Sequence, residues 1–157
     1  MQKITPFLWF NDNAEEAMNF YVSIFKNSKV LSINRWGETG ARVAGSVTTV
    51  TFEIEGQEFI GLNGGAHYSF TPAIWLLVDC KSQEEVDELW GKLCDGGAEV
   101  QCGWLRDKYG LSWQIIPSVL LEMLSDEDSE KSGRVWAAMM KMVKIDVVAL
   151  KRAYEGW

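Results

Sequence analysis

The residues of this chain that could do chemistry are aromatic rings and amides rather than charged groups. Trp9, Phe59 and Trp75 offer flat apolar surfaces, and Asn63 and Gln114 offer hydrogen-bonding amides. Aromatic walls with a few orienting polar groups are typical of a small-molecule pocket. These residues therefore predict a site for a flat or aromatic ligand, which stacks on the two tryptophans and receives hydrogen bonds from the two amides.

His67 and Asp107 each have a catalytic and a structural interpretation. His67 is the only histidine of the chain. It could act as a general base at the rim of the site, because its pKa is normally near neutrality, or it could be a surface histidine. We include it among the ligand-binding candidates. Asp107 begins a predicted turn, where its carboxylate is expected to accept bonds from backbone amides, with catalysis as the alternative. The sequence assigns no catalytic residue.

The three cysteines are interpreted as small reduced hydrophobic residues. Cys80, Cys94 and Cys102 are odd in number and form no C-x-x-C pair. A catalytic thiol is the alternative, but it needs a nearby histidine or basic pair to lower its pKa, and the sequence offers none close by.

A repeated strand-and-helix pattern positions the candidate residues. The sequence Pro-Phe-Leu-Trp at 6–9 recurs as Pro-Ala-Ile-Trp at 72–75, an offset of 66, and Ala-Glu-Glu-Ala at 14–17 recurs as Gln-Glu-Glu-Val at 83–86, an offset of 69. The repeat predicts two similar modules, 1–65 and 72–117, with a ligand between them. A helical extension, 118–157, has no counterpart in the first module.

Hydrophobic periodicity and turn residues predict the elements of both modules. The expected strands are 4–10, 30–36, 47–54, 59–62, 73–78, 100–104 and 111–116. Asn13 is a plausible N-cap for a first helix, and Ser82 with Glu85 forms a capping-box pattern for a second, which Gly96 and Gly97 end. The expected helices of the extension are 119–124, 135–143 and 147–154.

Alternation along these strands divides their side chains between two faces. Trp113 and Ile115 are expected to face the helices. The other face is expected to line the site with Phe7, Trp9, Phe59, Gly61, Asn63, Ala73, Trp75, Leu77, Ser112, Gln114 and Ile116. The alternative is that the tryptophans fill the core of a closed barrel that holds no ligand.

Composition excludes several classes of function. The 157 residues are enough for one compact domain with its own core. The formal charge of −7 argues against nucleic acid as a partner, because phosphate binding needs a basic face. Neither a signal peptide nor an apolar run of ~20 residues is evident, so a cytoplasmic protein without a membrane partner is expected.

At this point the chain resembles a known family. The resemblance rests on the motifs FNDNAEEA at 10–17, NGG at 63–65, EVDELW at 85–90, CGWLRDKYGLSWQIIP at 102–117 and MKMVKID at 140–146. They are similar to the PhnB-like branch of the vicinal oxygen chelate superfamily, which includes glyoxalase I, extradiol dioxygenases and bleomycin-resistance proteins. The resemblance implies an α+β fold of two βαβββ modules forming a cup over residues 1–117, followed by the helical extension.

The resemblance also implies where a metal is held in superfamily enzymes. They place His or Glu on the first strand of each module and Glu on the last. The matching positions here are Phe7, Ala73, Gly61 and Gln114, and none is a charged or imidazole ligand. We therefore expect no catalytic metal and no cofactor.

The branch often carries the label 3-demethylubiquinone-9 3-methyltransferase. A methyltransferase of the usual kind holds S-adenosylmethionine at a glycine-rich turn between a strand and a helix. The only glycine cluster after a predicted strand is 61–65, and the residues that follow, 66–72, do not open a helix cleanly.

Three functions remain open. The first is a small-molecule-binding protein without the catalytic metal, whose partner is an unknown, flat or aromatic molecule, with or without a reaction. The second is an enzyme, either methyltransferase-like or a metal-dependent glyoxalase or dioxygenase. The third is an assembly protein with a filled cup, whose helical extension packs across a homodimer.

Overall fold

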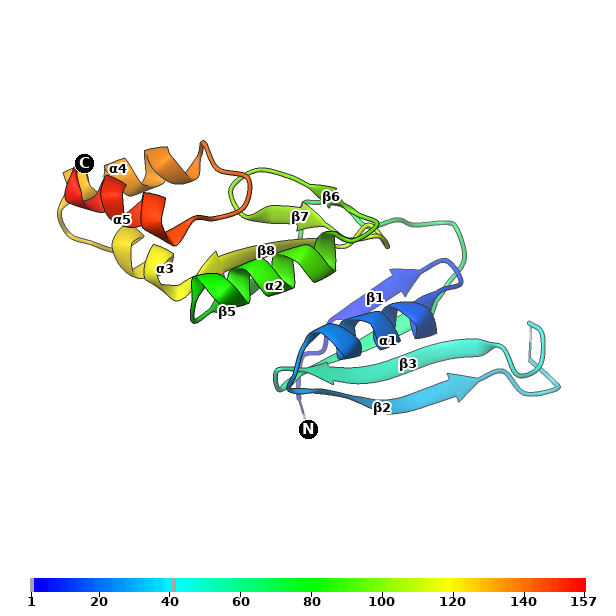
Figure 1. The fold of residues 1–157 in the computed structure, drawn as a ribbon. Coiled ribbons are helices and arrows are strands. Elements are labelled where there is room, and N and C mark those ends of the chain that lie inside the picture. The colour runs from blue at the N-terminus through cyan, green and yellow to red at the C-terminus, as the bar shows by residue number, and fades with distance from the viewer. Residues whose placement is uncertain (1, 41) are drawn as a thin grey trace. The chain divides into compact units, whose positions relative to one another are not determined.

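The computed structural model describes residues 2–40 and 42–157, which form two compact units, Met1–Phe70 and Thr71–Trp157 (Figure 1). We call them unit 1 and unit 2. Each contains a four-stranded sheet and a helix in the order βαβββ, so the predicted α+β architecture of two repeated modules is confirmed.

Unit 1 is a mixed sheet with one helix on one face. Its elements are β1 (Phe7–Phe10), α1 (Ala14–Ile24), β2 (Ser28–Arg35), β3 (Val47–Ile54) and β4 (Gln57–Asn63). The strand order is β1-β4-β3-β2, with β1 parallel to β4 and the other pairs antiparallel. The Glu55–Gly56 turn joins β3 to β4 with positive φ angles of 49° and 81°, as a tight hairpin turn requires.

The core of unit 1 lies between α1 and the sheet. Tyr21 of α1 stacks on Phe52 of β3, and Phe52 stacks on Phe59 of β4, with ring centroids 6.2 and 5.6 Å apart. All three rings are buried. Val50, Phe52 and Ile54 alternate with polar residues along β3 and face this core, as the period of two predicts.

Unit 2 repeats the module and adds three helices. Its elements are β5 (Leu76–Cys80), α2 (Gln83–Cys94), β6 (Ala98–Glu99), β7 (Trp104–Arg106), β8 (Ser112–Pro117), α3 (Ser118–Leu124), α4 (Ser129–Met139) and α5 (Val147–Glu155). The strand order is β5-β8-β7-β6, equivalent to that of unit 1. The Ser82 hydroxyl accepts a hydrogen bond from the Glu85 amide, and Gly96 follows α2 with φ of 76°, so both predicted helix ends are confirmed.

The register of the repeat differs from the sequence prediction. The first strand of unit 2 begins at Leu76, so Ala73 and Trp75 precede it. β1 ends at Phe10 and β5 ends at Cys80, and both of these residues are buried, which gives an offset of 70 (80 − 10) instead of 66. The Pro-x-x-Trp likeness was misleading because it matched residue types across a strand and a connecting segment. Pairing with β8 and burial against α2 set the actual register.

The helical extension packs on unit 2 itself. One hydrophobic cluster joins Ile116 at the end of β8 to side chains of the extension, namely Leu120, Met123, Val135, Met139, Ile145 and Leu150. Ile116 was expected on the ligand face, and the extension covers it instead. Backbone amides of Cys102 and Gly103 also donate to the carbonyls of Met142 and Val143, both at 2.8 Å. The extension is therefore part of the core of unit 2.

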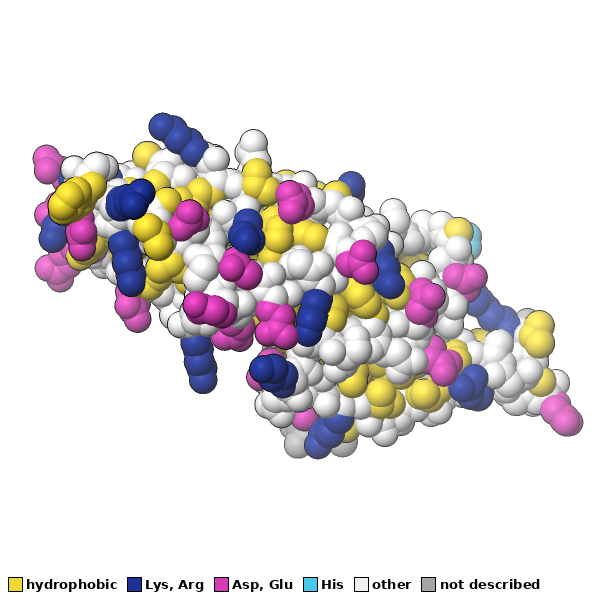
Figure 2. Space-filling model, viewed as in Figure 1, with side chains coloured by type: hydrophobic (Ala, Val, Ile, Leu, Met, Phe, Trp, Pro, Cys, Tyr) yellow, Lys and Arg dark blue, Asp and Glu magenta, His cyan; other side chains and the backbone are white. Residues whose placement is uncertain are grey.

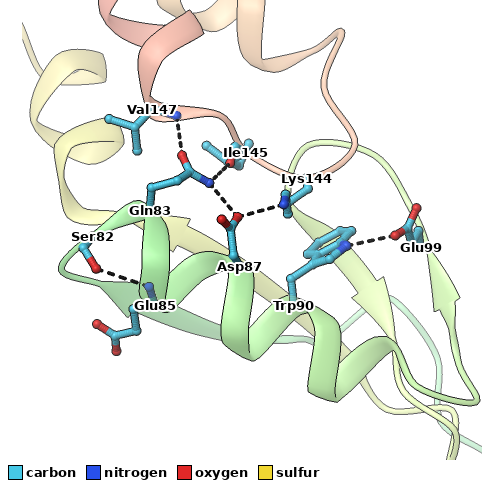
Figure 3. A network of polar contacts seen from close by, with 9 residues as sticks. All are labelled: Ser82, Gln83, Glu85, Asp87, Trp90, Glu99, Lys144, Ile145 and Val147. Atoms are coloured by element: carbon cyan, nitrogen blue, oxygen red, sulfur yellow. Dashed lines mark hydrogen bonds and ion pairs between the residues drawn. The ribbon is translucent and has the colours of Figure 1, made fainter.

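A polar network at the start of α2 holds the segment before α5 (Figure 3). The Gln83 amide donates to the Ile145 carbonyl at 3.0 Å and accepts from the Val147 amide at 2.7 Å. Asp87, one turn later, accepts from Gln83 at 2.9 Å and pairs with Lys144 at 2.8 Å. Bonds to Lys144 and Gln83 lower the pKa of Asp87.

The described surface has mixed charge. Figure 2 shows Lys and Arg side chains interspersed with Asp and Glu side chains, with no single basic patch on the face drawn. Among the described residues, every helix is too short or too polar to cross a membrane.

Candidate functional site

Each sheet has one face covered by its helix and one that is not, which we call the open face. In unit 1, β1 pairs with β4 so that Phe7 lies beside Ile60 and Trp9 beside Leu62. Paired residues project to the same side of a sheet, so these four side chains share the open face. Phe7 is 58% exposed there, and Thr49 and Thr51 of β3 continue the face beyond β4.

Phe59, Gly61 and Asn63 do not lie on the open face, contrary to the sequence prediction. Phe59 is only 6% exposed, and its ring packs in the core on Phe52. A Cβ on Gly61 would lie 3.0 Å from Val50 and 3.3 Å from Phe10, both on the helix side. The prediction reversed the faces of β4 because a one-residue error in strand register moves every side chain to the other side.

Asn63 has a structural role at the beginning of α1. Its side-chain oxygen accepts a hydrogen bond from the Ala14 amide at 2.8 Å, and its side-chain nitrogen donates to the Val47 carbonyl at 3.2 Å. Asn13, the predicted N-cap, makes no such bond through its side chain. The first-turn donor is thus satisfied from β4, and the Asn63 amide already has a partner at each end.

Trp9 lies on the open face as predicted, and the segment after β4 holds it. Its indole N–H donates to the Gly65 carbonyl at 2.8 Å, and its ring meets Tyr68 edge-on at 5.0 Å. A Cβ on Gly64 would lie 2.4 Å from the ring, so only glycine allows this approach. His67 is exposed in the turn of the same segment, without a hydrogen bond or ion pair to any described residue.

The open face of unit 2 brings Trp75 and Gln114 together, as the sequence predicted. The Trp75 indole N–H donates to the Gln114 side-chain oxygen at 3.1 Å. The Gln114 nitrogen in turn donates to the Cys102 carbonyl at 3.0 Å. Leu77 pairs with Gln114 across the sheet and is 49% exposed beside it. The amide is thereby fixed in one orientation, and Trp75 remains 40% exposed.

Sequence reasoning missed Trp104, which completes this group. It lies opposite Gln114 on β7, and its ring meets Trp75 edge-on with centroids 4.5 Å apart. Arg106 follows two residues later on the same face, opposite Ser112. Residue types do alternate along Trp104, Leu105 and Arg106, but three residues are too few for alternation to identify a face from the sequence. We call Trp75, Trp104, Arg106 and Gln114 the unit 2 platform.

Asp107 performs the predicted turn role. The carboxylate is buried and accepts from the Tyr109 and Leu111 amides at 2.8 and 3.1 Å. It also accepts from the Trp113 indole N–H at 2.9 Å. These bonds fix the β7–β8 hairpin that carries Trp104 and Gln114.

Two of the cysteines have weakly acidic thiols. Burial, and then the nearby carboxylates of Glu85 and Asp79, raises the pKa of the Cys80 thiol from 9.0 to about 12. Burial and the Glu99 carboxylate raise the pKa of Cys94 to about 11. A nucleophilic thiol needs the opposite shift, so these environments favour the structural interpretation.

Alkylation should be slow at Cys80 in the folded protein. At pH 8 a shift of three units lowers the thiolate population roughly 1,000-fold relative to the unfolded chain. Mass spectrometry after iodoacetamide treatment, with and without guanidinium, measures this protection, and equal rates in the two samples would contradict it. Because the folded thiol keeps its proton between pH 9 and 12 while the unfolded one loses it, stability should fall as pH rises above 9.

The residues do not fit the metal that the superfamily resemblance implies. In the observed register Leu77, not Ala73, matches Phe7, and both are apolar. Gly61 has no side chain, and Gln114 is bonded at both ends of its amide. In the part of the chain that the structure describes, no three His, Cys, Asp or Glu side chains are grouped so as to hold an ion.

Comparisons with known proteins agree with this fold. A family model described as 3-demethylubiquinone-9 3-methyltransferase matches residues 2–116. The solved structure of the PhnB protein from Bacillus cereus is similar, with 43% identity, a TM-score of 0.69, and coverage of 74% of this chain and 99% of that chain. No protein with a curated description matches the chain.

Two more distant structures share the fold alone. Protein PA1353 from Pseudomonas aeruginosa has 15% identity and a TM-score of 0.63, covering 74% of this chain and 98% of that chain. FosX, a fosfomycin resistance protein from Listeria monocytogenes solved with Mn(II) and sulfate, has 19% identity and a TM-score of 0.54, covering 79% of this chain and 97% of that chain. The family match ends at residue 116, so the helical extension lies outside it.

Proposed function

Because the chain belongs to the 3-demethylubiquinone-9 3-methyltransferase family, within the glyoxalase and bleomycin-resistance superfamily, we propose that it binds a small flat molecule on an open sheet face without a catalytic metal. The unit 2 platform supports this proposal most directly. Its two indole rings and its oriented amide leave an apolar surface beside fixed polar groups, as a small-molecule site requires.

Neither Asp107 nor Cys80 supplies a catalytic group at the platform. The Asp107 carboxylate already accepts three hydrogen bonds that hold the hairpin. The Cys80 thiol has a raised pKa and faces the covered side of β5. The geometry therefore favours binding of a small molecule over catalysis by these side chains.

Substitutions on the platform should weaken binding. Trp75→Ala removes the exposed ring and the indole donor, and Gln114→Ala removes the acceptor that orients it. We expect each to lower affinity about tenfold, the effect of losing one ring contact or one well-placed hydrogen bond. The measurement is titration calorimetry with the tightest ligand found by saturation-transfer NMR in a set of neutral naphthalene and quinoline compounds.

Trp136→Ala is the matched control for this experiment. Trp136 is 55% exposed on α4, among the helices of the extension, and its loss should leave affinity unchanged. Unchanged affinity in both Trp75→Ala and Gln114→Ala would place the site elsewhere. Elemental analysis tests the proposed absence of a catalytic metal, because one stoichiometric transition metal per chain would overturn it.

The family description favours a methyltransferase as the second candidate. The segment after β4 carries Gly64 and Gly65 but continues into a turn at 66–67, and α2 begins only at Gln83. The glycines therefore do not lead into a helix N-terminus, the feature that commonly binds S-adenosylmethionine. Calorimetry with S-adenosylmethionine distinguishes the candidates, since micromolar binding would favour the methyltransferase.

A further inference from the structure

The unit 2 platform has an imbalance between hydrogen-bond donors and acceptors. Its amide oxygen, on Gln114, already accepts from Trp75. The carboxylate on the same face, Asp79, accepts from the Ser118 hydroxyl at 2.6 Å. The four side chains of the platform therefore offer one acceptor oxygen, that of Gln114, beside several N–H donors.

Two donors on the platform have no partner in the described residues. The Trp104 indole nitrogen is shielded from solvent and makes no hydrogen bond. A buried donor without a partner is unfavourable, so an acceptor that reaches it gains more than one at an exposed donor. The Arg106 side chain is exposed and makes no ion pair or hydrogen bond with any described residue.

Two carboxylates of the unit 2 sheet, those of Asp79 and Glu99, lie away from Arg106. Asp79 pairs with Ile116, whereas Arg106 pairs with Ser112, four residues earlier on β8. This separation corresponds to about 13 Å along a strand. Glu99 pairs with Leu105 and accepts from Trp90 of α2, so it faces the helix side. Neither of these two carboxylates therefore lies beside Arg106 on the open face.

The spacing of these groups defines the shape of a ligand. Trp104 and Arg106 are two residues apart on one face of β7, which corresponds to about 7 Å. The exposed ring of Trp75 lies against Trp104. An aromatic ring on Trp75 can therefore present an attached acidic group to the guanidinium, which binds carboxylates through paired N–H groups.

We propose that the ligand of this platform is a planar aromatic anion, with its ring on Trp75 and its acidic group bound by Arg106 and the Trp104 N–H. This inference rests on the proposed function and adds the chemical class of the ligand. Trp75 precedes β5 and contacts the Trp104 ring, so this binding mode requires the Trp75 ring to move when the anion reaches the shielded Trp104 nitrogen.

A matched pair of probes tests the inference. 2-Naphthoate and 2-naphthalenemethanol share the ring and differ in charge. Calorimetry should give at least about tenfold tighter binding of 2-naphthoate, the usual advantage of a charge-assisted hydrogen bond. Arg106→Gln should remove this preference while leaving the alcohol unaffected. Lys151→Gln removes an equal charge from the exposed face of α5. It should change neither the preference for 2-naphthoate nor the affinity for the alcohol.

The Trp104 indole proton gives a readout that a general charge effect would not produce. In ¹H–¹⁵N spectra, its resonance, assigned with Trp104→Phe, should move downfield with 2-naphthoate and not with the alcohol. If both probes bind equally to the native protein and to Arg106→Gln, the inference fails and the proposed function stands. If neither probe binds and no compound of the neutral set binds either, both the inference and the proposed function fail.

Discussion

Replacing Asp107 with alanine is expected to destabilise unit 2 by about 3 kcal/mol or more. The substitution leaves two backbone amides and the Trp113 indole N–H without their acceptor, and each buried donor left unpaired costs about 1–3 kcal/mol. The measurement is urea unfolding followed by circular dichroism, where the midpoint should fall with little change in slope.

Two further variants separate the parts of this effect. Asp107→Asn keeps one acceptor oxygen and should lose less stability than Asp107→Ala. Trp113→Phe removes the indole donor, so the double variant with Asp107→Ala should be less destabilised than the sum of the two single variants. Strict additivity would show that the Trp113 contact contributes nothing, and a change below 1 kcal/mol in Asp107→Ala would contradict the role of the carboxylate in the hairpin.

Replacing Leu150 with alanine should destabilise unit 2 by about 3 kcal/mol, within the range of buried leucine truncations. Leu150 is fully buried on α5 in the cluster that includes Ile116 of β8. The loss arises from removed apolar contacts and from the cavity left behind. Chemical unfolding is again the measurement.

Val148→Ala is the control on the same helix. Val148 is 57% exposed, so its truncation should change the free energy of unfolding by less than about 0.5 kcal/mol. Equal effects of the two substitutions would mean that the extension does not pack on unit 2 as described. Deleting 118–157 would expose Ile116, so light scattering of intact chains is the better test of a homodimer.

The sequence predicted the order of elements better than the orientation of side chains. The β3 range and the Glu55–Gly56 turn were correct because alternation and turn residues are local signals. The helix ends at Ser82 and Gly96 were correct for the same reason. Phe59 and Asn63 were placed on the wrong face because strand faces depend on pairing with β1 and β3, which no local pattern specifies.

The candidate site shows the same division. Trp75 and Gln114 were predicted together, and the structure joins them by a hydrogen bond. Trp104 and Arg106 were missed because β7 is three residues long, too short for periodicity to identify a face. The unpaired Trp104 donor is visible only when every neighbour is in place.

By itself, the sequence determined that this protein consists of two repeated strand-and-helix modules and carries a single histidine, because residue type, alternation and turn chemistry are properties of short segments. Only the tertiary structure decided which residues share a face, that the repeat is offset by 70, and that the helical extension completes the core of unit 2. These features depend on contacts between residues far apart in the chain, where a shift of one position reverses every side chain of a strand.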